Sequence, residues 1–134
     1  MKILIVGLGL IGGSYCKAIT SYTNHEVYGL NRNQKVIEDA VKCGCIIRGA
    51  DTSELDLFDM VIVCLHPQPT EQFMRDNMSK FKKGCILTDV CGIKGQMTIN
   101  MTKLAAEHGV NYVGTHPMAC LLYTSPSPRD GLLS

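Results

Sequence analysis

The sequence lacks a marked excess of either charge and lacks a long apolar run. Its 134 residues include 13 Lys and Arg against 12 Asp and Glu, which gives a net charge of +1. A chain so nearly neutral has no electrostatic basis for binding nucleic acid or an anionic membrane surface, so neither is expected as a partner. No apolar stretch approaches the roughly 20 residues that span a bilayer.

The amino-terminal segment also lacks the features of a secretion signal. Residues 3–6 are apolar, but glycines interrupt the run from Gly7 onward and no Ala-x-Ala-like cleavage site follows. A signal peptide needs a longer apolar region and such a site. The segment is therefore interpreted as a first β-strand.

Paired cysteine motifs are absent as well. Seven cysteines occur without a Cys-x-x-Cys pair, and the single Cys43-x-Cys45 has no second pair to complete a zinc site. No metal site is predicted. Most of the cysteines lie inside apolar segments, where a free thiol packs as a small hydrophobe. The pattern predicts a reduced protein of the cytoplasm.

What the sequence does contain is a regular alternation of strand-like and helix-like segments. Short apolar runs predict six strands, and apolar residues at helical spacing predict four helices between them. Such an alternation with short links is typical of an α/β fold with a doubly wound, mostly parallel sheet. The predicted strands are residues 2–6, 26–30, 45–47, 60–65, 85–89 and 111–114; the predicted helices are 11–22, 34–43, 70–80 and 96–108, with Pro67 and Pro69 breaking the chain before the third helix.

Residues 7–13 read Gly-Leu-Gly-Leu-Ile-Gly-Gly and lie between the first strand and the first helix. In a Rossmann-type turn Gly7 allows the tight bend, Gly9 lets a pyrophosphate approach the backbone, and Gly12 lets helix and strand pack closely. The helix start adds free N–H groups and a partial positive charge. A tight turn without a ligand is the alternative, but the flanking strand and helix favour a dinucleotide site. Its expected residues are Gly7, Leu8, Gly9, Leu10, Ile11 and Gly12.

A carboxylate is missing at the end of the second predicted strand, where enzymes that use NAD usually hold the ribose hydroxyls with Asp or Glu. The residues there are Asn31, Arg32 and Asn33. Asn31 would not repel a 2′-phosphate, and Arg32 could pair with that phosphate or stack on adenine. The segment therefore predicts NADP in preference to NAD. A solvated surface charge is the alternative for Arg32.

Three further segments follow the later strands, at the edge where open α/β sheets bind ligands. They are Cys64-Leu65-His66-Pro67, residues 88–94 and residues 114–119. With the glycine turn, the Asp-x-x-x-x-Lys of residues 89–94 and the Gly-Thr-His-Pro-Met of residues 114–118, the sequence resembles the prephenate/arogenate dehydrogenase family of tyrosine biosynthesis. The resemblance covers residues 1–119, and Gly-Thr-His-Pro-Met is its most specific part.

The resemblance implies oxidative decarboxylation of prephenate to 4-hydroxyphenylpyruvate, or of arogenate to tyrosine, with NAD(P) taking the hydride. It implies that His116 is the catalytic residue, which accepts the hydroxyl proton or polarises that bond. A neutral imidazole suits this role near neutral pH. A loop histidine that only caps the strand end is the alternative. Leu65, His66 and Pro67 are expected to form the wall beside the nicotinamide.

Cys91, Gly92 and Lys94 are candidate substrate residues after the fifth predicted strand. Many family members have Ser where this chain has Gly92, so any hydrogen bond there must come from the backbone or from water. Cys91 could replace that hydroxyl or could be a small packing residue. Lys94 could lie near an anionic substrate or could be solvated.

The last 15 residues depart from the family. Residues 120–134 have no periodicity and a centre rich in Ser and Pro, which predicts poor order. The resemblance implies that a helical domain, which forms a homodimer and supplies substrate groups, follows residue 119, and nothing like it is present. The sequence thus predicts an NAD(P)-binding Rossmann domain over residues 1–119 and a non-family tail. Such a truncated cofactor domain is expected to turn over weakly or not at all.

Two other functions are left open by the residues. One is a Rossmann dehydrogenase or reductase that acts on another small acid, and the Gly-Thr-His-Pro-Met segment argues against it. The other is a non-catalytic module that binds NADP without dehydrogenase activity.

Overall fold

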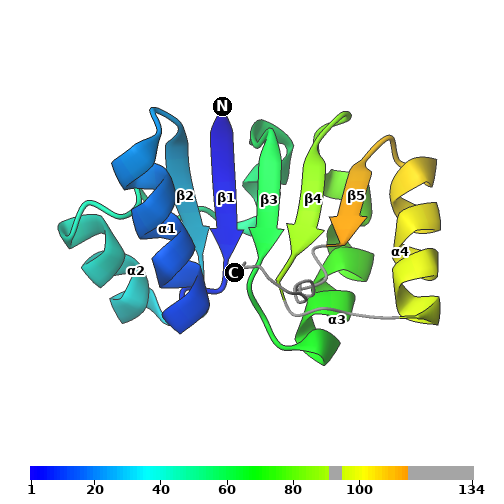
Figure 1. Ribbon diagram of the computed structural model, residues 1–134, viewed down its shortest axis with the longest axis horizontal. Helices are drawn as coiled ribbons and strands as arrows, with labels where there is room; N and C mark the ends of the chain where they lie inside the picture. Colours follow the sequence, from blue (N-terminus) through cyan, green and yellow to red (C-terminus); the bar gives the residue numbers. More distant parts are fainter. Residues whose placement is uncertain (91–94, 115–134) are drawn as a thin grey trace, which may run out of the picture.

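Five parallel strands form one sheet in this computed structural model, which describes residues 1–90 and 95–114 (Figure 1). The strand order is β2-β1-β3-β4-β5, and every neighbouring pair is parallel. The chain runs outward from β1 to β2 and then returns to β3 on the other side of β1. This order confirms the predicted doubly wound α/β fold. The strands are β1 (Lys2–Val6), β2 (Glu26–Leu30), β3 (Met60–Val63), β4 (Ile86–Asp89) and β5 (Asn111–Gly114).

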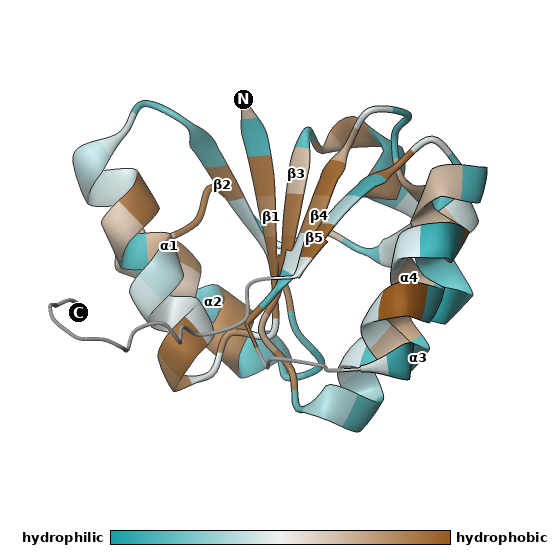
Figure 2. Cartoon of the chain, turned by 45° about the vertical axis from the view of Figure 1, so that its right-hand side comes forward, coloured by the Kyte–Doolittle hydropathy of each residue, from teal (hydrophilic) through white to brown (hydrophobic). Residues whose placement is uncertain are grey.

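Helices cover both faces of the sheet, with α1 and α2 on one side and α3 and α4 on the other (Figure 1, Figure 2). Two short 3₁₀ segments, η1 and η2, complete the described elements. Within the described residues, no helix combines the length and the apolar character needed to cross a membrane. The bounds are α1 (Leu10–Tyr22), α2 (Gln34–Lys42), η1 (Thr52–Leu57), α3 (Pro67–Asn77), η2 (Met78–Lys80) and α4 (Gln96–Glu107).

The central strands are apolar on both faces because both faces are covered, as is usual for parallel sheets. On one face Leu4 of β1 packs in a cluster with Met74 of α3 and Met101 of α4. On the other face Ile5 packs in a cluster with Ile37 of α2. Figure 2 shows the apolar strands between the two helical layers. This double burial fixes the carboxyl ends of the strands, from which the loops of the candidate site begin.

The predicted strand at residues 45–47 was wrong. The backbone N–H of Cys45 donates to the carbonyl of Ala40 at 2.9 Å, so the segment begins as the end of helix α2 and not as a strand. Beyond it the chain follows the outer edge of β2 and makes only one isolated bridge, between Gly29 and Gly49. The N–H of Ile47 still reaches the carbonyl of Val27 at 2.8 Å. The helix end therefore uses the N–H groups of Cys45 and Ile46, and pairing with β2 begins only at Ile47.

Helix α3 begins earlier than the prediction of residues 70–80 placed it. Pro67 and Pro69 lie in its first turn instead of breaking the chain before it. The first N–H groups of a helix have no intrahelical acceptor, so proline loses nothing there. The helix proper ends at Asn77, and the separate 3₁₀ turn η2 takes the last residues of the predicted range.

Candidate functional site

Backbone contacts require glycine at two positions in the turn between β1 and α1. Gly7 has a φ of +89°, and a Cβ there would lie 2.7 Å from the carbonyl oxygen of Cys64. A Cβ on Gly12 would lie 1.9 Å from the carbonyl oxygen of Gly7. No side chain tolerates the second contact, and the left-handed φ of Gly7 also disfavours other residues. Helix α1 can thus start directly against the end of β1.

Gly9 immediately precedes α1 and borders open space. A Cβ at Gly9 would meet no atom within 4 Å, and no side chain caps the helix there. The first N–H groups of a helix lack intrahelical acceptors and carry a partial positive charge. The turn therefore offers hydrogen-bond donors beside an unfilled space, which is the arrangement that a phosphate requires.

Asn31, just after β2, contacts the glycine turn through its side chain. Its Oδ1 accepts the backbone N–H of Leu8 at 3.0 Å. Asn33 caps helix α2 by accepting the backbone N–H of Lys35 at 2.9 Å. The side-chain oxygens of Asn31 and Asn33 are therefore both used as acceptors for backbone N–H groups. Arg32 between them is exposed, and no acidic side chain of the described ranges pairs with it.

The segment between β3 and α3 forms the opposite wall of the site. His66 is exposed and is the residue that precedes the first turn of α3. The hydroxyl of Thr70 donates to the carbonyl of Leu65 at 3.1 Å, and the N–H of Thr70 donates to the carbonyl of His66 at 2.9 Å. Thr70 is completely buried, so it fixes this wall from behind. The sequence pattern did not predict Thr70, for which a hydroxyl in the first helical turn is only a weak signal.

These segments enclose an open groove of about 1050 Å³ at the carboxyl edge of the sheet. The groove brings together every predicted cofactor residue except Leu8, which packs in the core, and Asn33. Thr52 and one face of α3 also line it, and the sequence pattern did not predict them. The α3 positions share the helical spacing i, i+3, i+4, i+7 and i+8 from Pro69, which places them on one face but does not indicate that this face meets the groove; Thr52 has no such spacing. The α3 residues are Pro69, Gln72, Phe73, Asp76 and Asn77.

The carboxyl ends of β4 and β5 are tied together beside this groove. Asp89 is completely buried and accepts a hydrogen bond from the hydroxyl of Tyr112. The hydroxyl of Thr88 donates to the carbonyl of Val113 at 2.6 Å. A buried carboxylate needs such donors, and no sequence motif indicated this pair. The predicted substrate and catalytic residues that follow these strands lie outside the described residues; they are Cys91, Gly92, Lys94 and His116.

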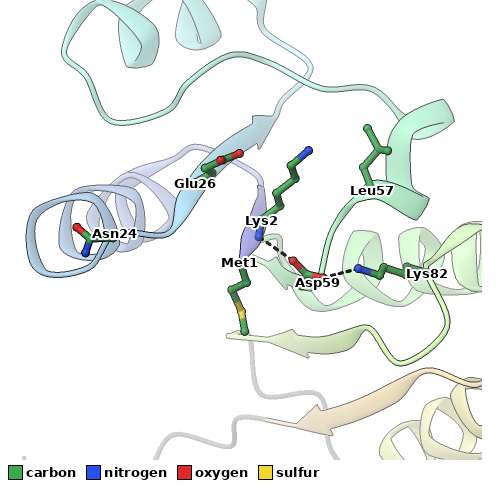
Figure 3. Close-up of a pocket in the computed structure, with 7 residues that line it drawn as sticks. All are labelled: Met1, Lys2, Asn24, Glu26, Leu57, Asp59 and Lys82. Atoms are coloured by element: carbon green, nitrogen blue, oxygen red, sulfur yellow. Dashed lines mark hydrogen bonds and ion pairs between the residues drawn. The ribbon is translucent and has the colours of Figure 1, made fainter.

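A second, smaller pocket of about 340 Å³ lies at the amino edge of the sheet. Figure 3 shows its side chains, with Asp59 between Lys2 and Lys82. The Asp59 carboxylate accepts the backbone N–H of Lys2 at 2.8 Å and pairs with the ammonium group of Lys82. The hydrogen bond from Lys82, and then that from Lys2, hold the pKa of Asp59 below its usual value. The charged groups of Asp59 and Lys82 in this pocket are therefore already paired within the protein.

The five cysteines of the described ranges form no disulfide bond. Burial raises the pKa of Cys16 to about 12 and that of Cys85 to about 11. The pKa of the exposed Cys43 is lowered, mainly by a hydrogen bond with the thiol of Cys45. Within the same ranges no three potential metal ligands come together.

The parallel sheet, the reversal of strand order at β1 and the groove at the carboxyl edge define a Rossmann-type nucleotide-binding domain. The chain matches the family model of the prephenate dehydrogenase nucleotide-binding domain over residues 16–122. It therefore belongs to this family. The match begins beyond the glycine turn, so the geometry of the turn and the family match are independent observations.

Individual relatives agree with this assignment. The prephenate dehydrogenase of Lactococcus lactis subsp. cremoris (strain MG1363) is 29% identical over 126 residues, which are 88% of this chain and 34% of that protein. The crystal structure of Synechocystis arogenate dehydrogenase has a TM-score of 0.77 at 27% identity, over 87% of this chain and 41% of that one. Prephenate dehydrogenase from A. aeolicus, solved with hydroxyphenyl propionate and NAD⁺, has a TM-score of 0.76 at 24% identity, over 88% of this chain and 42% of that one, and shows a shared fold. The chain spans about a third of the length of the curated relative.

Proposed function

We propose that the groove at the carboxyl edge binds a nicotinamide dinucleotide, with the glycine turn as the site of its pyrophosphate. The observation that carries this proposal is the open space at Gly9 beside the uncapped start of α1. No protein atom requires glycine at this position, whereas a phosphate close to the backbone does. The A. aeolicus relative, which was solved with NAD⁺, supports the same use of the shared fold.

We propose NADP as the preferred form of this cofactor. Arg32 lines the groove, is exposed and has no acidic partner in the described part of the chain. Asn31 is neutral and its carbonyl oxygen is already bonded to Leu8, so no carboxylate opposes a 2′-phosphate at the end of β2. A guanidinium group can hold such a phosphate through two parallel hydrogen bonds.

Titration of the chain with NADPH and with NADH tests this preference. We expect NADPH to bind about tenfold more tightly, since one hydrogen bond to a charged group is worth that much. Arg32→Ala should remove the difference. Lys35→Ala is the matched control, because Lys35 is a nearby exposed cation that pairs with Asp39 and does not line the groove. Equal affinities in the wild type, or a preference that R32A leaves intact, would contradict the proposal.

We further propose that the domain serves an enzyme that oxidatively decarboxylates prephenate or arogenate. The bound nicotinamide would supply the hydride acceptor. Leu65, His66 and Pro67, held by Thr70, form the wall against which the cofactor ring is placed. The Gly-Thr-His-Pro-Met sequence supports His116 as the group that accepts the substrate hydroxyl proton. Residues 91–94 are proposed to lie beside the substrate.

Turnover in this proposal needs polypeptide beyond the cofactor domain. The chain corresponds to about a third of the Lactococcus lactis enzyme, so about two thirds of that protein has no counterpart here. We assign residues 1–119 to the cofactor domain and residues 120–134 to a tail outside it. We propose that a helical part outside residues 1–119 completes the site and forms a homodimer.

A chimera tests the catalytic part of the proposal. Residues 1–119 are joined to the remainder of the Lactococcus lactis enzyme, and reduction of NADP⁺ is followed with prephenate and with arogenate. His116→Asn should lower kcat by two to four orders of magnitude, the usual size of a general acid–base contribution, and leave the affinity for NADPH unchanged. His25→Asn, at the amino edge, should have no effect on kcat. Near-normal turnover of H116N rejects the assignment. Cofactor binding without turnover on either substrate favours a non-catalytic NADP-binding module.

A further inference from the structure

Helix α3 lines the groove far beyond the glycine turn. Its five lining positions run from Pro69 to Asn77 along one helical face, a distance of about 12 Å at the α-helical rise. Leu30 and Thr52 line the groove as well. Phosphates at the start of α1 do not account for this length. A ligand that fills the groove therefore places a further part against α3.

Asn77 is a buried amide in this part of the groove. It is only 5% exposed, and its Nδ2 donates to the carbonyl of Phe73 at 2.8 Å. This bond fixes the orientation of the amide, because a carbonyl oxygen only accepts. In residues 1–90 and 95–114 no donor reaches Oδ1 of Asn77. Buried polar atoms are nearly always paired, with protein groups or with water, so a ligand that displaces water from this oxygen must replace its donor.

The residues around Asn77 indicate which chemical group could supply that donor. Phe73, one helical turn earlier, and Leu30 give this part of the groove apolar walls. The more exposed Gln72 and Asp76 are bonded to each other at 2.8 Å, so the buried acceptor is the carbonyl oxygen of Asn77. A flat, apolar-faced ring that carries an amino group matches this environment. Adenine is the part of a nicotinamide dinucleotide with that shape.

We propose that Asn77 is a specificity-determining residue for the cofactor, with its Oδ1 accepting a hydrogen bond from the 6-amino group of adenine. The inference rests on the proposed cofactor function and extends it to the choice of purine. A 6-oxopurine places a second acceptor opposite Oδ1, so both oxygens are left without a donor. Sites built on a hydrogen bond reject ligands that lack its partner.

The test compares NADPH with its hypoxanthine analogue, in which a carbonyl group replaces the 6-amino group, as ligands of the 134-residue chain. The wild type should bind NADPH about tenfold more tightly than the analogue. Asn77→Leu, which is similar in shape, should reduce this ratio to about one. Asn77→Asp should preserve the ratio, because a carboxyl group buried against the Phe73 carbonyl is held protonated: its hydroxyl replaces Nδ2 as donor and its other oxygen stays an acceptor. Arg75→Ala is the matched control on the same helix, because Arg75 is exposed, pairs with Glu71 and does not line the groove; it should also preserve the ratio.

The outcomes separate this inference from the cofactor proposal. Equal affinity of the wild type for NADPH and the analogue overturns the inference and leaves the cofactor proposal standing. Binding of neither overturns both. Thermal unfolding of each variant shows whether it folds. If N77L does not fold, the wild-type ratio and N77D decide, and loss of the ratio in N77D counts against the role of Oδ1 as acceptor.

Discussion

The two edges of the sheet differ in whether their polar groups are paired within the described residues. At the amino edge, the Asp59 carboxylate is bonded to Lys2 and paired with Lys82 (Figure 3). At the carboxyl edge, the start of α1 has no side-chain cap, and Gly9 borders open space. Further along the same groove, Asn77 has an Oδ1 that accepts no hydrogen bond from the described residues. At the amino edge the described polar groups are paired within the protein, and we propose that a ligand pairs with those at the carboxyl edge.

The difference follows from the direction of the strands. In a parallel sheet the carboxyl ends of all strands meet at one edge, where each chain segment turns into the amino end of a helix. Helix amino ends bring unpaired N–H groups and positive potential to that edge. Paired groups at the other edge stabilise the fold without forming a site. Substitutions at the two edges should therefore separate stability from binding.

The largest effect is expected from Gly12→Ala. The added Cβ would lie 1.9 Å from the Gly7 carbonyl oxygen, so α1 must move away from β1. We expect a loss of about 3 kcal/mol or more in unfolding free energy, the upper range for overpacking, together with loss of NADPH binding. Gly13→Ala is the matched control, because its Cβ meets no atom within 4 Å and alanine is favoured in a helix by about 1 kcal/mol. Chemical denaturation of both variants measures the contrast; equal stability of the two would refute the packing role of Gly12.

Gly9→Ala should separate binding from stability. Its φ of −72° suits alanine, and the new Cβ meets no protein atom, so the unfolding free energy should stay near the wild-type value. The Cβ occupies space proposed for the pyrophosphate, and overpacking of 1–3 kcal/mol corresponds to about tenfold to hundredfold weaker NADPH binding. Calorimetric titration measures this loss. Unchanged affinity would place the phosphates elsewhere.

The smallest effect is expected from Asp59→Asn, at the other edge. The lowered pKa of Asp59 means that its carboxylate stabilises the fold at neutral pH, and that this contribution is lost as the pH falls through the folded-state value. D59N should therefore have a slightly lower Tm than the wild type at neutral pH, and the gap should close below about pH 4, near the usual pKa of Asp. NADPH affinity should not change. A gap that persists in acid would show that the ion pair is not its cause.

The fold was predictable from the sequence where the local pattern of apolar residues matches their burial in the folded protein. The apolar runs at β1 and β3 are buried on both faces. Continuous apolar runs of this kind are typical of strands in a parallel sheet, so the sequence predicted them. The segment at residues 45–47 is apolar for another reason, since Cys45 and Ile46 are buried while completing the end of α2. Apolar character alone does not distinguish these two uses. The first turn of α3 was missed because proline both breaks and begins helices.

The part of the site formed by the glycine turn was predictable, because the glycines themselves are visible in the sequence. The glycine turn could be recognised because backbone contacts exclude a side chain at Gly7 and Gly12. Asn77 and Thr70 gave no comparable signal. The role of Thr70 depends on its hydrogen bonds to Leu65 and His66, and that of Asn77 depends on which face of α3 meets the groove. Both follow only from the packing of α3 against the sheet.

The most direct test of the contrast between the edges is an amide NMR titration of the chain with NADPH. We expect saturable shifts in the glycine turn, at Arg32 and along the groove face of α3, with Lys2, Asp59 and Lys82 unchanged. Gly9→Ala should abolish the shifts at the same NADPH concentration. An absence of saturable shifts in the wild type, or shifts centred on Asp59 and Lys82, would contradict the assignment of the carboxyl edge as the cofactor site.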